Sequence, residues 1–337
     1  MQGRPMTAHP HDALFKSAFE SAAHAAALLS GLLPPGVRDA IAWRTLESER
    51  GSFIDAALAG HHSDLLFSAR LVTGAPVLLY LLLEHQSTGD PVMPLRVLTY
   101  QVRIWNRGHS EQPHATLAPV IAVVISHVPG GWTDARAFHD LFAPSVLAVP
   151  GLPVLMPQFS LVIEDLAHLS NDELKARSLA TFPKLALWLL RDARDPARLL
   201  ASFDAWITAF LEVERAPGGL ESFTRLLTYM FRVIDPVRQH ELHAKIRLLG
   251  RRAEEVAMTI ADEIHEEGRA KGHEEGRARG QAEGRRATLR QLLLYKFQRS
   301  ALEEADEARL AAITPEAIDR YLQRVLTADS LAAVFVD

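Results

Sequence analysis

The sequence predicts an α/β fold in the first half of the chain and an all-helical fold in the second half. Three patterns lead to this prediction. Short apolar runs bounded by turn residues alternate with amphipathic segments up to about residue 165. From residue 171 to about 260 the apolar residues recur with helical spacing alone, and beyond residue 266 glycine returns at every fourth position. The expected parts are an α/β core (9–165), a helical extension (166–260), a glycine-periodic charged stem (261–287) and a small C-terminal helical domain (288–337).

The composition excludes several kinds of functional site. The 337 residues include no cysteine, which rules out thiol catalysis, iron–sulfur clusters and cysteine-based zinc sites. The net charge of −5 means that any basic surface for nucleic acid must be local. The longest apolar run, residues 75–83, is far shorter than the roughly 20 residues that span a bilayer, and the first residues lack the apolar core of a signal peptide. We therefore expect a cytoplasmic protein that does not enter a membrane.

The elements of the α/β core follow from the spacing of its apolar residues. Residues 11–35 have the periodicity of a single helix, which Gly31 and two following prolines end. Two strands joined by the turn TGAP come later, and a buried strand rich in β-branched residues follows an amphipathic helix. The expected elements are a helix at 11–35, strands at 51–58, 65–72 and 77–83, a helix at 93–108, and strands at 117–127 and 158–166.

Carboxylates stand at both outer ends of the predicted hairpin. A turn centred near Gly74 would place Asp64 directly opposite Glu84, and alternation along the strand places Glu84 and Gln86 on one face. Facing carboxylates repel unless a cation lies between them, and Mg²⁺ is commonly held by one or two carboxylates. Mn²⁺ and Ca²⁺ are alternatives, and Gln86 would orient the attacking water. The other interpretation is that all three residues only reach solvent at strand ends.

Several motifs in the same order resemble the Rpn family of recombination-promoting nucleases, which are also labelled transposases. They are HDALFK, GSFID, HSDLLFS and LLLEHQS, with the spacing to RVLTYQVRIW. The resemblance covers about residues 9–165 and, less clearly, the helices to 260. It implies a PD-(D/E)xK restriction-endonuclease-like core (α-β-β-β-α-β) and metal-dependent DNA endonuclease activity linked to recombination. The matching residues are Asp64, Glu84 and Gln86, where the wider superfamily has lysine at the position of Gln86.

Basic residues that follow the hairpin are candidates for DNA binding. Arg96, Arg103 and Arg107 fall on one stripe of the helix expected at 93–108, because seven and eleven residues are near whole numbers of turns. On the first helix, Lys16 is a candidate for a phosphate contact and Glu20 for a further metal-side acid. The alternative for each is an ordinary solvated residue. The apolar residues expected to face the core are Leu95, Leu98, Val102 and Trp105.

The tail holds the only internal repeat of the sequence. A glycine at every fourth position forms a smooth ridge on a helix, which would allow close packing against a second copy of the chain. Each glycine also costs a helix about 0.5–1 kcal/mol relative to alanine, so a flexible linker is the alternative. We expect a homo-oligomer assembled through this C-terminal region. The repeated residues are Gly268, Gly272, Gly276, Gly280 and Gly284.

Three functions remain open from the sequence. The first is hydrolysis of DNA phosphodiester bonds by a metal-dependent nuclease. The second is strand transfer of the transposase kind, which would join DNA ends as well as cut them. The third is a catalytically silent DNA-binding or assembly module. Plasmid cleavage separates the first from the third, and a strand-joining assay separates the first from the second.

Overall fold

The computed structural model describes residues 10–49, 64–84 and 89–335. The strand expected at 51–58 and the residue Gln86 therefore lie outside the described residues. Contacts within the chain divide it into two compact units, Met1–Ile260 and Ala261–Asp337.

The first unit contains a mixed sheet of five strands within its described part. Their order in the sheet is β1-β2-β3-β4-β5. The first three strands pair antiparallel, and β3, β4 and β5 pair parallel. A parallel pair needs a crossover connection, and α4 (Met93–Glu111) supplies it between β3 and β4. The strands are β1 (Glu47–Ser48), β2 (Leu65–Arg70), β3 (Pro76–Glu84), β4 (Val120–Ser126) and β5 (Val162–Asp165).

The segment expected to be one helix at 11–35 is two helices in the structure, and a third begins at its last residue, so the prediction of a single helix was wrong. They are α1 (Pro10–Phe19), α2 (Ala22–Leu32) and α3 (Pro35–Ala40). The backbone leaves the helical conformation at Ser21, which has φ −72° and ψ 124°. Serine is favoured at the start of a helix, and proline is favoured in the first turn, as at Pro35. The apolar periodicity continues through the break at Ser21, which is why the sequence alone suggested one helix, whereas the predicted end at Gly31 and the prolines agrees with the end of α2 at Leu32.

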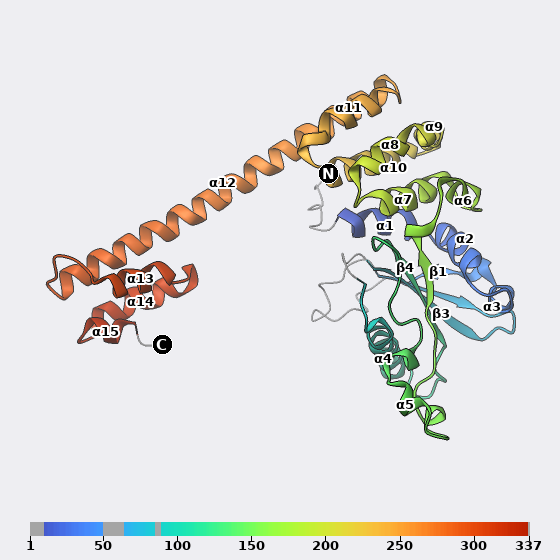
Figure 1. The fold of residues 1–337 in the computed structure, drawn as a ribbon, viewed down its shortest axis with the longest axis horizontal. Coiled ribbons are helices and arrows are strands. Elements are labelled where there is room, and N and C mark those ends of the chain that lie inside the picture. The colour runs from blue at the N-terminus through green and yellow to red at the C-terminus, as the bar shows by residue number, and fades with distance from the viewer. Residues whose placement is uncertain (1–9, 50–63, 85–88, 336–337) are drawn as a thin grey trace. The chain divides into compact units, whose positions relative to one another are not determined.

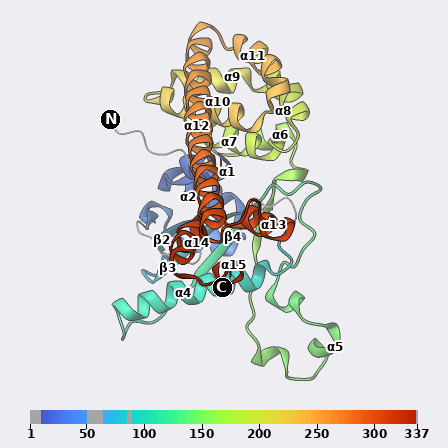
Figure 2. The same ribbon diagram turned by 90° about the vertical axis from the view of Figure 1, so that its left-hand side faces the viewer.

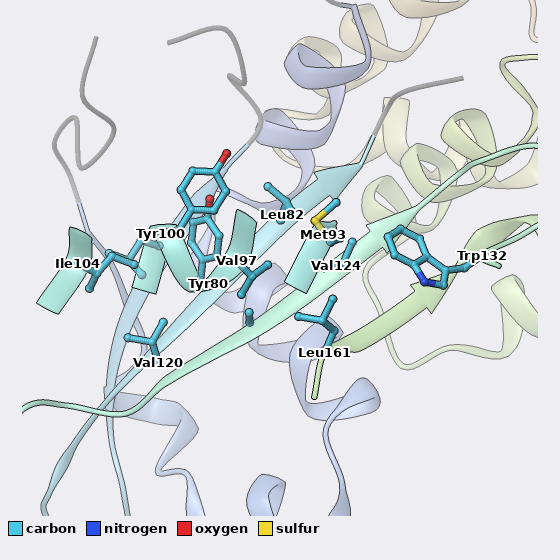
Figure 3. Packing of buried hydrophobic residues seen from close by; sticks show 12 residues of the cluster. Tyr80, Leu82, Met93, Val97, Tyr100, Ile104, Val120, Val124, Trp132 and Leu161 are labelled. Carbon is cyan, nitrogen blue, oxygen red and sulfur yellow. The ribbon is translucent and has the colours of Figure 1, made fainter. Parts of the chain in front are cut away.

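The sheet is covered on both faces, and α4 and α2 lie on opposite sides of it in Figure 1. Alternate side chains of β3 and β4 meet one face of α4, as Figure 3 shows. Tyr80 of β3 and Tyr100 of α4 lie against each other there, with ring centroids 5.4 Å apart. The buried members of this cluster are Leu66, Tyr80, Leu82, Met93, Val97, Tyr100, Ile104, Val120, Ala122, Val124, Trp132 and Leu161.

Short helical segments separate β4 from β5 and follow β5. The first group consists of η3 (Phe138–Leu141), α5 (Pro144–Leu147) and η4 (Pro153–Leu155). After β5 the chain is helical as predicted, and these helices gather beyond one end of the sheet beside α1 (Figures 1 and 2). They are α6 (Asn171–Ala176), α7 (Thr181–Asp192), α8 (Pro196–Ser202), α9 (Ile207–Arg215), α10 (Gly219–Val233) and α11 (Gln239–Arg247).

An aromatic core holds these helices together. The Trp188 and Trp206 rings stack with their centroids 5.2 Å apart, and the Phe203 and Phe210 rings stack at the same separation. All four side chains are almost completely buried. The first helix of the chain, α1, packs against α7 and α10. The short helix η5 (Leu166–His168) contacts both α7 and β4, and so links the helical half to the sheet.

The second unit contains most of α12 (Arg251–Lys296), which runs as one helix through all five repeated glycines. Three helices follow it, α13 (Glu304–Ala312), α14 (Pro315–Thr327) and α15 (Leu331–Val334). They enclose a separate apolar core with the end of α12, in which Leu289, Leu293 and Ile318 are fully buried. None of the helices that the structure describes has both the length and the apolar character needed to cross a membrane.

Candidate active site

The β2–β3 hairpin differs in register from the sequence prediction. Leu65 pairs with Leu81 and Arg70 with Pro76, so extending the ladder places Asp64 level with Leu82. The pairing is thus offset by two residues from the predicted pairing of Asp64 with Glu84. An offset of two preserves the face, because side chains alternate with a period of two. Asp64 and Glu84 therefore still belong to the same side of the sheet, the side that α4 covers.

Asp64 is held by its neighbour across the hairpin. The Tyr80 hydroxyl donates a short hydrogen bond to Oδ2 of Asp64, while Oδ1 is buried and has no hydrogen-bond partner among the described residues. Burial raises the pKa of the Asp64 carboxyl to about 7, against the opposing effects of Tyr80, Arg96 and Lys16. The site thus contains a carboxylate whose charge is incompletely compensated.

Glu84 is the last residue of β3, and its side chain is completely buried. Arg96 of α4 approaches Oε2 of Glu84 with Nη1 at 3.0 Å, and the same Nη1 lies 3.1 Å from Oδ2 of Asp90. Burial acts to lower the pKa of the Arg96 guanidinium, but the charges of Glu84 and Asp90 raise it above its usual value. One guanidinium therefore joins two carboxylates at the end of the hairpin.

The orientation predicted for the helix after the hairpin was wrong in part, although Trp105 packs against the core as expected. Leu95 and Val102, expected in the core, are 48% and 42% exposed. The stripe Met93, Val97, Tyr100 and Ile104 is buried instead. Both stripes have helical spacing, and the observed one is selected by its fit to Tyr80 and Leu82 of the sheet.

The three arginines predicted to form one DNA-binding stripe still share one side of α4, but their surroundings differ along the helix. Arg96 turns toward Glu84, and only 15% of its side chain is exposed. Arg103 is half-buried, whereas Arg107 is exposed and bonds Glu111 at 2.8 Å. Of the three, Arg107 is therefore the exposed one, and Arg103 is only partly exposed.

The first helix brings a different acid to the site from the one considered in the sequence. Asp12 is 2% exposed, and its charge acts on Asp64, whereas Glu20 is exposed. Lys16 also acts on Asp64, so its charge lies near that carboxyl. A signal for Asp12 existed in the sequence, since Asp12, Phe15 and Phe19 share a helical face that is otherwise apolar.

The helical half also reaches this end of the sheet. The Nδ1 atom of His11, on α1, lies 2.8 Å from the Tyr229 hydroxyl of α10. Burial lowers the pKa of the Arg194 guanidinium, and the charges of Tyr229 and Glu84 oppose that shift. Arg194 follows α7, so helices far along the sequence contribute charge near Glu84. Sequence reasoning missed this contribution, because no local pattern links Arg194 to the hairpin.

The residues present are compatible with a divalent cation. The Asp64 oxygen without a partner is a buried oxygen ligand of the kind that Mg²⁺ and Ca²⁺ take, and Glu84 is a second carboxylate on the same face. Within residues 10–49, 64–84 and 89–335, no group of three or more His, Asp or Glu side chains is arranged to hold a metal. A cation here would thus depend on the two carboxylates together with water, substrate oxygens or residues outside these ranges.

Comparison with known proteins gives the family. Residues 9–221 match the family described as "Putative transposase, YhgA-like", a span that includes the sheet, α1, α4 and most of the aromatic helical core. The chain belongs to this family. The resemblance of its motifs to the Rpn proteins is thereby confirmed.

Relatives within the family carry names of both active and inactive nucleases. Recombination-promoting nuclease RpnA of Escherichia coli strain K12 is 26% identical over 260 residues, covering 77% of this chain and 84% of RpnA. RpnC of the same strain is 36% identical over 115 residues, which cover 34% of this chain and 38% of RpnC. The inactive recombination-promoting nuclease-like protein RpnE, also of Escherichia coli strain K12, is 25% identical over 273 residues. The match covers 79% of this chain and 85% of RpnE. No solved structure matches the chain.

Proposed function

We propose that this protein is a metal-dependent endonuclease that hydrolyses DNA phosphodiester bonds, with a PD-(D/E)xK-type core and a role in DNA recombination. The observation that carries the proposal is the position of Asp64 and Glu84. Both carboxylates belong to one face of neighbouring strands, at the same end of the hairpin, and both lie beside the cation Arg96. Membership of a family with members named as nucleases supports DNA as the substrate.

Asp64 and Glu84 are the proposed ligands of Mg²⁺, with Mn²⁺ and Ca²⁺ as alternatives. A bound Mg²⁺ would supply Lewis-acid stabilisation of the phosphate charge and a lowered pKa for the attacking water. Tyr80 fixes the Asp64 carboxylate through its hydrogen bond. Gln86 is proposed to orient the water, and Arg103 and Arg107 to contact flanking phosphates.

A catalytically silent DNA-binding protein is the second candidate. One observation favours it directly, since RpnE, a relative that matches 79% of this chain, is named inactive. A second is that the described part of the site offers two metal-binding carboxylates rather than three. The two candidates make opposite predictions for cleavage and the same prediction for DNA binding.

The test is incubation of purified protein with supercoiled plasmid in Mg²⁺, Mn²⁺, Ca²⁺ or EDTA. We expect nicking in Mg²⁺ or Mn²⁺ that EDTA abolishes and that Asp64→Asn and Glu84→Gln each remove. Glu20→Gln is the matched control, because Glu20 is an exposed acid next to the helix that carries Lys16. Binding without cleavage in any metal would favour the silent protein, and joined products from labelled DNA ends would favour strand transfer.

A further inference from the structure

We propose that Arg96 is the residue that contacts the scissile phosphate, and that its ion pair with Glu84 and Asp90 is its resting position before DNA binds. This inference rests on the proposed nuclease function and deepens it by assigning a substrate-binding group inside the site. It also separates Arg96 from Arg103 and Arg107, which would bind DNA without taking part in the reaction.

The first step of the argument is the burial of the ion pair. The Glu84 side chain is completely buried, and the side chains of Arg96 and Asp90 are 15% and 13% exposed. Removing charges from water is costly, so a buried carboxylate of this kind needs a nearby cation. Arg96 provides it from the opposing helix, and its guanidinium is thereby held beside the proposed metal ligands.

The second step concerns the donors that Arg96 leaves unused. Its Nη1 atom forms the ion pairs with both Glu84 and Asp90. Its Nε–H is buried and has no hydrogen-bond partner among the described residues. The Tyr100 hydroxyl acts on the same guanidinium but makes no hydrogen bond with Nε. A buried donor without an acceptor is destabilising, which points to an acceptor supplied by a ligand. Arginine presents its donors as a planar fork that matches two oxygens of a phosphate. The unused Nε–H belongs to the same guanidinium that pairs with Glu84.

The third step is the effect of ligand binding on the ion pair. When Glu84 binds a divalent cation, its charge is compensated and its attraction for Arg96 weakens. Asp90 is a second acceptor for the same Nη1 atom and keeps the guanidinium at the edge of the site. From there Arg96 can donate to a nonbridging phosphate oxygen and stabilise the negative charge that develops during hydrolysis. Its role is thus contact with the substrate, rather than attraction of DNA from a distance.

The test compares Arg96→Gln and Arg96→Lys with the control Arg225→Gln. Arg225 is also paired with a glutamate, Glu221, but on an exposed helix surface. Three quantities are measured for each protein: the Mn²⁺ dissociation constant without DNA, the DNA dissociation constant in Ca²⁺, and the single-turnover cleavage rate at saturating DNA. Circular dichroism and thermal melting establish that each variant is folded.

For Arg96→Gln we expect a cleavage rate lower by about 100-fold, the size of effect seen when a transition-state donor is removed. The DNA dissociation constant should change by less than about 3-fold, since the variant removes one phosphate interaction among several. Mn²⁺ should bind more tightly because a competing cation is gone, whereas a site that had merely collapsed would bind it more weakly. Arg96→Lys keeps the charge without the fork, so its rate should fall by about 10-fold.

A wild-type cleavage rate in Arg96→Gln would overturn the inference while leaving the nuclease proposal intact. Weaker Mn²⁺ binding by that variant would overturn it as well. If Arg96→Gln does not fold, Arg96→Lys decides, and a wild-type rate in that variant would refute the phosphate contact. If the wild-type protein cleaves DNA in no metal, the proposed function itself fails and the inference fails with it.

Discussion

The Tyr80 hydroxyl donates a hydrogen bond to Oδ2 of Asp64 from the neighbouring strand of the hairpin. The ring of Tyr80 is 4% exposed and lies against Tyr100 of α4 (Figure 3). The position of the Asp64 carboxylate is therefore set by Tyr80, whose own position is fixed by the strand that carries it and by packing against Tyr100. Burial raises the pKa of the Tyr80 hydroxyl well above its usual value, so this group remains a donor over the whole useful pH range.

We expect Tyr80→Phe to destabilise the protein and to slow cleavage. The change removes a donor to a carboxylate, which costs about 1.5–3 kcal/mol, and leaves both Asp64 oxygens without a side-chain partner. Thermal unfolding and single-turnover cleavage measure the two effects. Tyr295→Phe is the control, since Tyr295 is 87% exposed. Equal melting temperatures for Tyr80→Phe and wild type would show that the hydrogen bond does not contribute.

Arg103 and Arg107 of α4 should contribute to DNA affinity through counterion release. Arg103→Glu with Arg107→Glu should weaken binding and reduce the slope of log affinity against log salt by about 0.9 for each phosphate that is no longer neutralised. The control is Arg225→Glu, because Arg225 bonds Glu221 as Arg107 bonds Glu111, in each case four residues along a helix. A salt slope equal to that of the control would identify Arg103 and Arg107 as solvated residues only.

The glycines of α12 allow two effects to be separated in one experiment. A Cβ atom added at Gly272 or Gly276 would meet nothing within 4 Å in the single chain. Alanine at both positions should therefore stabilise the helix by about 0.5–1 kcal/mol per site. If the glycine ridge packs against a second copy, as we propose, the same variant should lose mass in sedimentation equilibrium.

Gly31→Ala serves as the control for that experiment, because a Cβ at Gly31 also meets nothing within 4 Å. It should leave the mass of the particle unchanged. The proposal of assembly through α12 would be abandoned if the wild-type chain sediments as a monomer at tens of micromolar. It would also be abandoned if the variant at Gly272 and Gly276 keeps the wild-type mass.

Glu164 should make stability depend on pH in a defined direction. It lies on β5 and pairs with Arg177, but burial raises the pKa of its carboxyl above 4.5 in spite of that arginine. The folded state then binds the proton more tightly than the unfolded state, so stability is gained as the pH falls through the folded pKa toward 4.5. Wild type should gain in melting temperature relative to Glu164→Gln as the pH is lowered from neutral toward that value. A constant difference, or a decrease, would contradict this cause.

The sequence predicted the shared face of Asp64 and Glu84 better than it predicted their pairing. Their common face depends only on the alternation of side chains, which survives a register offset of two. The pairing itself depends on the turn, which is centred on Thr73 and not on Gly74, with a hydrogen bond from the Leu71 N–H to the Ala75 carbonyl. Turn geometry of this kind is not determined by residue type alone.

Arg96 was a candidate for DNA binding in the sequence, but its pairing with Glu84 could not be predicted, for a different reason. The stripe through Leu95 and Val102 and the stripe through Val97 and Tyr100 have the same helical period, so periodicity cannot choose between them. The choice is made by complementarity to Tyr80 across the interface, which is a tertiary property. The sequence did contain one useful pattern, a charged residue on an otherwise apolar helical face. That residue is Asp12 on α1, and α4 has no equivalent pattern that identifies Arg96.

The hydrogen bond to Asp64 and the ion pairs around Glu84 lie within residues 64–96, so a ribosome releases these groups early in translation. The strand that completes the sheet around them, β4, is made later, and it pairs with β3 from Leu78 to Glu84. A nascent chain that ends before Val120 carries every one of these side chains but leaves that edge of β3 in water. The ion pair around Glu84 then lacks the dry surroundings that give it strength. The side chains of the candidate site are thus synthesised before the strand that shields them from water.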